Sequence, residues 1–341
     1  MTDMMKRWEI PGFGIDGLML ASVPRPTPKA GEVLVAVEAV SLNYRDLAVA
    51  EDGMTADLQF PFTPASDMAG RVVAVGEGVT RFVPGDRVIS TYITNWIDGE
   101  PLSWANSPTQ GGPIPGMLAQ YVATPADWCV MAPASLSAQE ACTLPIAALT
   151  GWMALIELGH LRPGQTVVVQ GTGGVSLFAL QFAAAAGARV IVTSSSDEKI
   201  ARAIELGATY GINRSKTLEW QSVVVKLTQG RGADHILEMA GGENVKRSIA
   251  AIAPGGRISV IGLLESDELS TPIMPLLASR AQIVAVAVGP RRVLEDVVRM
   301  IDHHAIKPVI DGVYGFTQAR EAFAHLKRGA FGKIVVTVGE D

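Results

Sequence analysis

Three glycines in the middle of the chain have the spacing of a turn that holds a dinucleotide pyrophosphate. Gly171, Gly173 and Gly174 follow an apolar run at 167–169 and precede a helix that we expect to open at Val175. Glycine supplies positive φ and lets the backbone come close to the pyrophosphate, whose charge would lie against the free N–H groups of the helix N-terminus. These residues therefore predict a dinucleotide-binding site.

The turn lies between the elements that such a site requires. The continuous valines at 167–169 are typical of a strand covered on both faces, the helix ends at Gly187, and a second strand is expected at 189–193. Ser176 replaces the third glycine of the G-x-G-x-x-G fingerprint. Because serine is small, helix and strand can still pack closely.

The end of the second strand favours NADP(H) over NAD(H). NAD-specific versions of this fold place a carboxylate there, which accepts hydrogen bonds from the ribose 2′-OH. This chain has serines at 194–196 and then Lys199, which offer hydroxyl donors and a cation to a 2′-phosphate. Asp197 is the opposing feature, and we expect it to cap a helix that begins at Glu198.

Length and composition agree with a two-domain globular protein. The chain has 341 residues, of which 48% are hydrophobic, and a net charge of −6 that gives no electrostatic reason to bind nucleic acid or an anionic membrane. No targeting segment is recognisable, so a cytoplasmic location is expected. The two cysteines, Cys129 and Cys142, form neither a disulfide framework nor a zinc spacing, and we expect both to be buried thiols.

The pattern of elements changes along the chain. Short valine-rich strands broken by proline and glycine fill the region up to about residue 132, which indicates an irregular β domain. From Ser137, which has capping-box spacing to Glu140, helices alternate with apolar strands and predict a parallel sheet. Six strands, the number of a doubly wound dinucleotide fold, are expected at 166–170, 189–193, 209–212, 235–239, 257–261 and 283–288.

Four segments resemble the medium-chain dehydrogenase/reductase superfamily. They are GRVVAVGEGVTRFVPGDRV at 70–88, TLPIAALTGW at 143–152, FGKIV at 331–335, and SLNYRD at 41–46, the last being similar to the zinc-independent quinone oxidoreductase-like branch. The resemblance covers nearly the whole chain. It implies an α/β protein with a GroES-like catalytic domain at 1–132 and 290–341 and a Rossmann NADP(H)-binding domain at 133–289.

The zinc ligands of this superfamily have no counterparts in the chain. Zinc-dependent members carry a cysteine ahead of an Asp, then a Gly-His-Glu run, and a lobe with four cysteines. Here Asn43 and Tyr44 lie in the region of the cysteine, Ala65–Asp67 replaces Gly-His-Glu, and the long loop at 91–116 has no cysteine. A tetrahedral zinc needs thiolate or imidazole ligands, so neither catalytic nor structural zinc is expected.

Without a metal, hydride addition to an activated alkene is easier than oxidation of a simple alcohol. Hydride would add to the β-carbon of an α,β-unsaturated carbonyl or quinone, and neutral donors would stabilise the developing enolate. The resemblance brings Asn43, Tyr44 and Ser66 to the nicotinamide as such donors. Asn43 and Tyr44 could equally serve only the local backbone. Asp46 is expected to cap a helix, and Asp67 to pair with Arg45 or Arg71.

Other roles follow from the resemblance or from the loop's composition. Trp96 and Trp104 could line the substrate cleft, although local packing is the more usual role of such residues. The apolar strand at 283–288 resembles the edge through which family members form homodimers. The residues expected to bind the cofactor are Thr150, Gly171, Thr172, Gly173, Gly174, Val175, Ser194, Ser195, Ser196, Lys199, Asn213, Arg214, Ala240, Gly241, Gly262 and Lys333.

Three functions remain open from the sequence. The leading one is an NADPH-dependent, zinc-independent reductase of α,β-unsaturated carbonyl compounds or quinones, acting on a small-molecule substrate. A zinc-free alcohol or carbonyl oxidoreductase is the alternative among enzymes. A non-catalytic NADPH-binding sensor or interaction protein is the alternative outside them, because fold alone does not imply function.

Overall fold

A computed structural model describes residues 3–54 and 57–339, and the chain divides into two compact units. Unit 1 comprises Met1–Leu149 and Val288–Asp341, and unit 2 comprises Thr150–Ala287. The two-part order expected from the sequence is present, but residues 133–149 belong with the β domain. Their contacts explain the difference, since the backbone N–H of Ile146 donates to the Asp67 carboxylate of the β domain.

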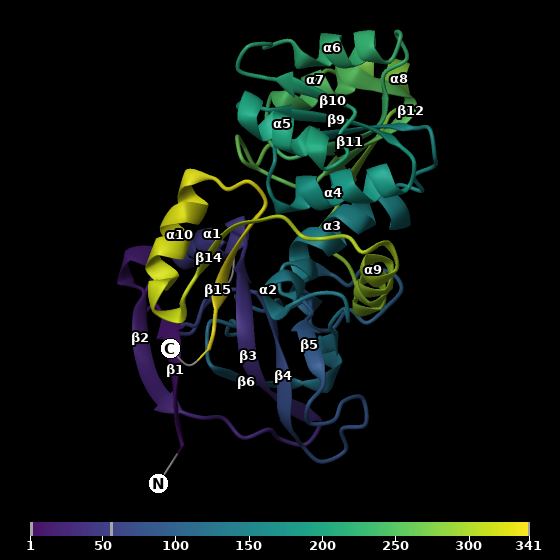
Figure 1. The fold of residues 1–341 in the computed structure, drawn as a ribbon. Coiled ribbons are helices and arrows are strands. Elements are labelled where there is room, and N and C mark those ends of the chain that lie inside the picture. Colours follow the sequence, from purple (N-terminus) through teal and green to yellow (C-terminus); the bar gives the residue numbers. More distant parts are fainter. Residues whose placement is uncertain (1–2, 55–56, 340–341) are drawn as a thin grey trace. The chain divides into compact units, whose positions relative to one another are not determined.

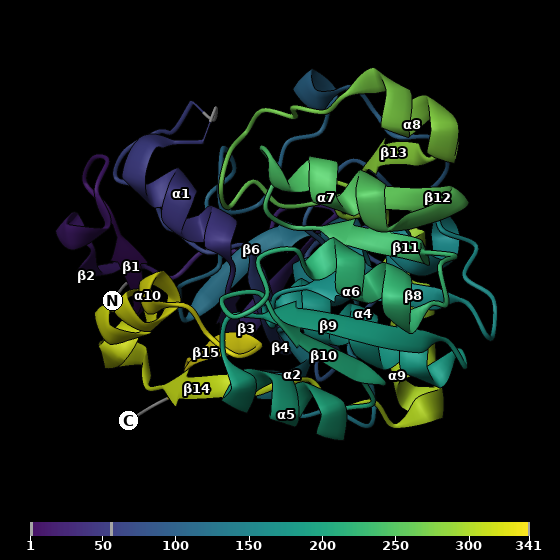
Figure 2. The same cartoon turned by 90° about the horizontal axis from the view of Figure 1, so that it is seen from above.

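Unit 2 is built on a six-stranded parallel sheet with the strand order β10-β9-β8-β11-β12-β13. This is the 3-2-1-4-5-6 order of the doubly wound dinucleotide fold, so the predicted Rossmann domain is confirmed. Figure 2 shows these strands following one another across the sheet. The strands are β8 (Thr166–Gln170), β9 (Arg189–Ser194), β10 (Tyr210–Asn213), β11 (Ala233–Glu238), β12 (Ile252–Val260) and β13 (Gln282–Ala285).

Helices cover both faces of this sheet. In Figure 1, α4 lies on one face, and α6 and α7 lie on the other. Every residue of β8 and β11 is buried, as expected of strands covered on both faces. β8 has three central valines, whereas β11 buries Asp234, His235 and Glu238 beside its apolar residues. The helices are α4 (Gly174–Ala185), α5 (Asp197–Glu205), α6 (Trp220–Leu227), α7 (Asn244–Ala251) and α8 (Ile273–Ser279).

Unit 1 contains a seven-stranded sheet in which the long strand β3 pairs with β15, β4 and β6. Strand β15 comes from the end of the chain and contains most of the FGKIV segment, which the resemblance identifies as the closing strand of this domain. It pairs with β14, a strand that was not predicted. The strands are β3 (Glu32–Leu42), β4 (Asp67–Val75), β5 (Arg87–Ser90), β6 (Tyr121–Pro125), β7 (Cys129–Met131), β14 (Ile310–Tyr314) and β15 (Lys333–Thr337), with β1 (Met4–Glu9) and β2 (Met19–Pro24) as a separate hairpin.

The helices of unit 1 pack around this sheet and its core. Figure 1 shows α10 alongside β14 and β15, where it contributes Phe323 to a core that also holds Val40 and Phe62. Both cysteines are buried and free, as predicted. The helices are α1 (Tyr44–Asp52), α2 (Ala138–Ala141), α9 (Arg291–His304) and α10 (Ala319–Arg328).

The segment after Ser137 begins as predicted and then changes form. Ser137 caps α2, and the Glu140 carboxylate accepts a bond of 2.8 Å from the Ser137 backbone N–H, which completes the capping box. The chain continues through a π-helical stretch at Leu144–Ala148, α3 (Leu149–Trp152) and a second π-helical stretch at Met153–Glu157. Unit 1 ends within this segment.

The loop at 91–116 is largely irregular, as predicted. Trp96 is 9% exposed and donates its indole N–H to the carbonyl of Gly99 at 3.0 Å, which is the local packing role considered for it. The Trp104 side chain lies outside the described part of the structure. Among the described residues, none of the helices is both long and apolar enough to cross a membrane.

Candidate functional site

The glycine turn of unit 2 leaves room in front of the N-terminus of α4. Gly171 has φ of +76°, which a side chain would strain, and its N–H donates to the Thr193 carbonyl at 2.8 Å. A Cβ built on Gly171 or Gly173 would have no atom within 4 Å. The turn therefore faces open space, into which the N–H groups opening α4 point.

Ser176 compensates for the missing third glycine of the fingerprint. Its side chain is 1% exposed and donates a hydrogen bond of 2.8 Å to the carbonyl of Gln170. This bond ties the first turn of α4 to the last residue of β8, so the helix stays close to the strand. The serine thus preserves the close packing that glycine normally provides.

A cavity of about 190 Å³ lies beside the turn at the carboxyl edge of the sheet. Ligands of open parallel sheets bind at this edge, near the point where the strand order reverses. Gly171 and Arg214, both predicted to bind the cofactor, line the cavity. Ala240, also predicted to bind the cofactor, lines it too, and the remaining lining residues were not among those predicted: Gln170, Thr193, Trp220, Met239, Asn244, Leu264 and Glu265.

A buried polar network supports the floor of this cavity. Glu238, at the end of β11, has no exposed surface and accepts hydrogen bonds from the backbone N–H groups of Ala240 at 3.0 Å and Gly241 at 3.2 Å. Asn244 and Gln170 also donate to its carboxylate, at 2.8 and 3.0 Å. A carboxylate with this many donors fixes the 239–241 turn that the sequence assigned to the cofactor.

Gly241 and Gly262 are required by close backbone contacts. A Cβ on Gly241 would lie 2.2 Å from the Ser266 carbonyl oxygen, and one on Gly262 would lie 2.3 Å from that of Met239. The turns after β11 and β12 therefore pack directly against each other. Contact of these glycines with a cofactor stays a prediction.

The serines after β9 are arranged differently from the prediction. Ser196, and not Asp197, caps α5, since its hydroxyl accepts a bond of 3.3 Å from the Lys199 backbone N–H. Asp197 is the first residue of α5, and its exposed carboxylate accepts a bond of 2.7 Å from Asn213 and pairs with Lys216. The helix begins one residue earlier than expected, which moves the capping position to Ser196.

Arg214 directly follows β10 and lies next to the end of β9. Its backbone N–H donates to the Ser194 carbonyl at 2.8 Å, and its guanidinium is half-exposed, 3.7 Å from the Glu265 carboxylate. Ser194 is buried, whereas Ser195 is exposed. A half-exposed cation therefore lies beside Ser194, the last residue of β9, and Lys216, which pairs with Asp197, adds a second cation that the sequence analysis missed.

In unit 1, Asn43 is the centre of a buried polar network. Its side-chain N–H donates to Asp67 at 2.9 Å, and its side-chain oxygen accepts a bond of 2.5 Å from Lys333. Lys333 donates a second bond, of 2.8 Å, to the Leu42 carbonyl. The amide of Asn43 is thus fixed in one orientation by an anion on one side and a cation on the other.

Two further residues join the network through Asp46. Asp46 accepts a bond of 2.8 Å from the Asn43 backbone N–H, which confirms it as a helix-capping residue, and its other oxygen accepts from the Ser66 hydroxyl. Arg45 donates to the Ser66 hydroxyl at 2.6 Å and to the carbonyls of Gln110 and Gly111, each at 3.1 Å. Arg45 therefore connects the network to the 110–112 loop.

Burial strongly perturbs the charges of the network. It raises the pKa of Asp67 to about 7, although the Lys333 ammonium acts in the opposite direction. Burial likewise lowers the pKa of Lys333 from its ordinary value, opposed by Asp67 and then Asp46. One oxygen of Asp67, Oδ1, has no hydrogen-bond partner among the described residues. The two charges are linked through the Asn43 amide, and each partly offsets the desolvation of the other.

Three predictions for unit 1 need correction. Ser66 has no exposed surface and donates its hydroxyl hydrogen bond to Asp46, so this hydroxyl is not free to donate to a substrate. Lys333 is 4% exposed and holds Asn43 and Leu42, so we assign it to the network and not to the cofactor. Asp67 pairs with neither arginine: Arg45 lies beside Asp46 at 3.5 Å, Arg71 lies beside Glu38 at 3.4 Å, and the cation near Asp67 is Lys333.

Tyr44 and Asn43 remain candidate hydrogen-bond donors to a substrate, and Thr150 remains a candidate contact for the cofactor. Tyr44 is the first residue of α1, and its side chain is 53% exposed. Asn43 is 8% exposed, and its amide nitrogen carries a second hydrogen besides the one donated to Asp67. Thr150, expected to contact the nicotinamide carboxamide, is 2% exposed and belongs to unit 2. Their contacts with a substrate or cofactor stay predictions.

The two sites differ in the groups that they can hold. The open glycine turn, the free N–H groups of α4 and the adjacent cavity fit a dinucleotide. The Asn43 network does not fit a zinc ion, because the groups it could offer as metal ligands are an amide, a hydroxyl and two carboxylates. These groups are already engaged with one another and with Lys333: Asn43 bonds to Lys333 and Asp67, and Ser66 bonds to Asp46. The described part of the chain holds no cluster of three or more His, Cys, Asp or Glu side chains that could bind a metal.

Comparison with known proteins agrees with this architecture. Residues 29–134 match the family model of the alcohol dehydrogenase GroES-like domain, and residues 174–303 match that of the zinc-binding dehydrogenase. A zinc-type alcohol dehydrogenase-like protein of Schizosaccharomyces pombe is 42% identical over 315 residues, which are 90% of this chain and 91% of that protein. A chloroplast envelope quinone oxidoreductase homolog of Arabidopsis thaliana is 29% identical over 339 residues, 95% of each.

A solved structure from Sinorhizobium meliloti 1021, provisionally described as an alcohol dehydrogenase, is 53% identical. It superposes with a TM-score of 0.95 over 99% of both chains. A GroES-like unit with a doubly wound dinucleotide unit defines a class of oxidoreductases. The chain belongs to the medium-chain dehydrogenase/reductase superfamily, and its relatives include both alcohol dehydrogenase-like and quinone oxidoreductase-like proteins.

Proposed function

We propose that this protein is an NADPH-dependent, zinc-independent reductase that delivers hydride to the β-carbon of an α,β-unsaturated carbonyl compound or quinone. The observation that carries the proposal is the Asn43 network. At the position where zinc-dependent relatives place metal ligands, this chain has an amide fixed between Lys333 and Asp67. Such a site lacks the Lewis acid that simple alcohol oxidation needs, but it retains neutral donors.

The chain's own residues have two tasks in this reaction. The bound nicotinamide supplies the hydride. As hydride adds to the β-carbon, the carbonyl oxygen becomes an enolate oxygen, to which Tyr44 and the second amide hydrogen of Asn43 are the donors that we assign. Lys333 and Asp67 position Asn43 by holding its oxygen and nitrogen in one orientation. Protonation of the enolate carbon by water completes the reduction.

The preference for NADPH is supported by the edge of β9 and β10. Arg214 and Lys216 are exposed cations next to the serines at 194–196, and Asp197 is already occupied by Asn213 and Lys216. A 2′-phosphate would find cations there, and it would not meet a free carboxylate on β9. The proposal assigns the cofactor to unit 2 and the substrate carbonyl to unit 1.

A homodimer joined through unit 2 is part of the proposal. β13 is an edge strand that pairs only with β12 among the described strands, and the neighbouring α8 exposes Ile273, Met274 and Leu277, each 62–72% exposed. An uncovered apolar edge favours pairing with a second copy. The cytoplasmic location expected from the sequence remains a prediction.

A second candidate function is a zinc-free alcohol or carbonyl oxidoreductase, which is favoured by similarity to the alcohol dehydrogenase-like relatives. Steady-state assays with NADPH against matched enones, quinones and aldehydes separate the two. We expect NADPH consumption with enones or quinones. Consumption with aldehydes alone would establish the second candidate. Thermal stabilisation by NADPH without turnover of any substrate would instead indicate a non-catalytic binding protein.

A further inference from the structure

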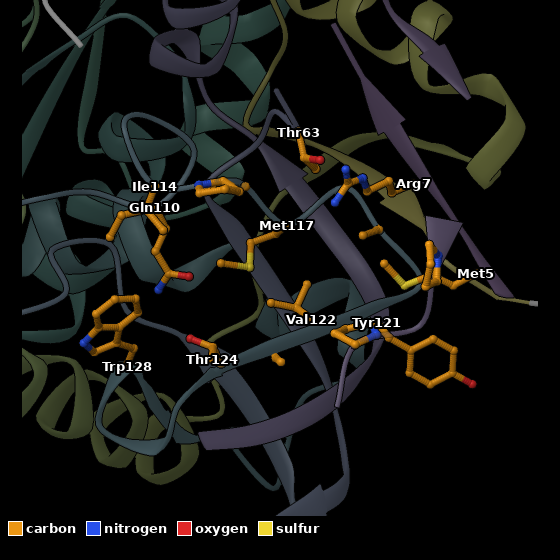
Figure 3. Close-up of a pocket in the computed structure, with 16 residues that line it drawn as sticks. Met5, Arg7, Thr63, Gln110, Ile114, Met117, Tyr121, Val122, Thr124 and Trp128 are labelled. Atoms are coloured by element: carbon orange, nitrogen blue, oxygen red, sulfur yellow. The ribbon is translucent and has the colours of Figure 1, made fainter. Parts of the chain in front are cut away.

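Unit 1 contains a cavity of about 250 Å³ that the proposed reaction does not use. Its walls come from β1, the loop at 110–117, β6 and the residue Trp128. Figure 3 shows the side chains that line it, with Met117 and Val122 near its centre and Trp128 and Met5 toward opposite ends. The cavity exceeds the roughly 150 Å³ of an engineered apolar cavity that binds benzene.

Most of the wall is apolar and its charges are already paired. Met5, Met117 and Val122 supply aliphatic and thioether surface, and Trp128 supplies an aromatic one. Among the described residues that line the cavity, Arg7 is the only cation, and its guanidinium lies 2.5 Å from the Glu9 carboxylate. A charged ligand would have to compete with Glu9, so the wall favours an uncharged molecule. Methionine sulfur and tryptophan both make favourable contacts with aromatic rings.

Thr124 provides an unsatisfied polar group in this wall. It is 3% exposed, and its hydroxyl has no hydrogen-bond partner among the described residues. Thr124 lies in β6 opposite Val33 of β3. By contrast, the Gln110 amide in the same wall donates to the Thr91 carbonyl at 2.6 Å. Buried hydroxyls nearly always have a partner, so Thr124 points to one that the protein itself does not supply.

We propose that this cavity is a binding site for a small, uncharged aromatic molecule that carries one hydroxyl or carbonyl group. The ring lies against Met5, Met117 and Trp128, and the polar group bonds to the Thr124 hydroxyl. The site is distinct from the donors proposed for hydride transfer, since neither Asn43 nor Tyr44 lines the cavity.

The test uses the full-length protein with carbon-13 methyl-labelled methionine and two matched probes. Benzyl alcohol carries the hydroxyl, and ethylbenzene replaces it with a methyl group. Met5 and Met117 line the cavity, whereas Met239 lines the cavity of unit 2 and serves as the internal control. Benzyl alcohol is expected to shift the methyl signals of Met5 and Met117 saturably and to leave Met239 unchanged.

Variants of Thr124 test the role of its hydroxyl. Thr124→Val is expected to weaken benzyl alcohol binding about fivefold and not to weaken ethylbenzene, since one neutral hydrogen bond is lost. Thr124→Ser keeps the hydroxyl and is expected to retain benzyl alcohol binding. Thr124→Ala serves if the valine variant does not fold. The proposal is overturned if neither probe shifts Met5 or Met117, if only Met239 responds, or if removal of the hydroxyl weakens both probes equally.

Discussion

Removing the buried cation of unit 1 should destabilise the protein in a pH-dependent way. Lys333→Met keeps the apolar stem of the side chain but removes the two bonds to Asn43 and Leu42 and leaves the Asp67 carboxylate without its counter-ion. Breaking a buried ion pair by removing one partner costs about 3–5 kcal/mol. We expect a loss of this size at pH 8.5, where Asp67 of the wild type is ionised.

The loss should be smaller at pH 6. The pKa of Asp67 is raised to about 7, so its carboxyl is largely protonated at pH 6 and does not need Lys333. Above pH 7 the wild type carries the Asp67 carboxylate together with the Lys333 ammonium that favours it, whereas the variant must either bury a lone carboxylate or keep it protonated. The penalty therefore grows by at most about 1.4 kcal/mol for each pH unit above 7, because the folded variant holds at most one more proton than the folded wild type.

The assay is urea unfolding followed by tryptophan fluorescence and circular dichroism at pH 6 and pH 8.5. Lys327→Met is the matched control, since Lys327 is exposed and its pair with Glu51 contributes at most about 1 kcal/mol at either pH. In an Asp67→Asn background, the penalty of Lys333→Met, measured against Asp67→Asn alone, should no longer change between pH 6 and pH 8.5. A Lys333→Met penalty that is equal at both pH values, or larger at pH 6, would refute this account of the network.

Four further predictions concern the cofactor and substrate sites. Gly173→Val adds a side chain that points into open space, and the φ of −78° at this position suits valine, so the variant should fold normally. The added side chain should exclude the pyrophosphate and weaken NADPH binding at least tenfold. Fluorescence titration measures the affinity, and Gly12→Val, also in open space, is the control. Ser176→Ala removes the bond to the Gln170 carbonyl and should lower the free energy of unfolding by about 1 kcal/mol in denaturant melts, a result that an unchanged stability would contradict. Arg214→Ala should weaken NADPH about tenfold and leave NADH unchanged, while the exposed Lys226→Ala should affect neither; equal losses for both cofactors would argue against a 2′-phosphate site. Tyr44→Phe should lower kcat about tenfold at an unchanged NADPH affinity, whereas Tyr210→Phe, also exposed, should not; an unaltered kcat would remove Tyr44 from the mechanism.

Local signals in the sequence were sufficient for much of unit 2 and for the start of α2 in unit 1. The glycine turn, the flanking strands and the Ser137 capping box all depend on residues within a few positions of one another, and the structure has each of them. The errors there are also local: the capping residue of α5 is Ser196, one position before Asp197.

The buried networks could not be predicted in the same way. Lys333 and Asn43 are 290 positions apart, and Glu238 and Gln170 are 68 positions apart, so only the folded sheets bring them together. The sequence offered Arg45 and Arg71 as partners for Asp67 and gave no sign that Lys333, in the closing strand, would be buried near it. Ser66 was misassigned for the same reason, since its burial depends on Asp46 and Arg45.

The most direct test of the proposed chemistry follows the transferred hydrogen. NADPH carrying deuterium on the transferred position of the nicotinamide is incubated with the protein and an enone, and the product is analysed by NMR. The account predicts one deuterium on the β-carbon of a saturated ketone. Deuterium on the carbinol carbon of an allylic alcohol would contradict it and would identify a carbonyl reductase instead.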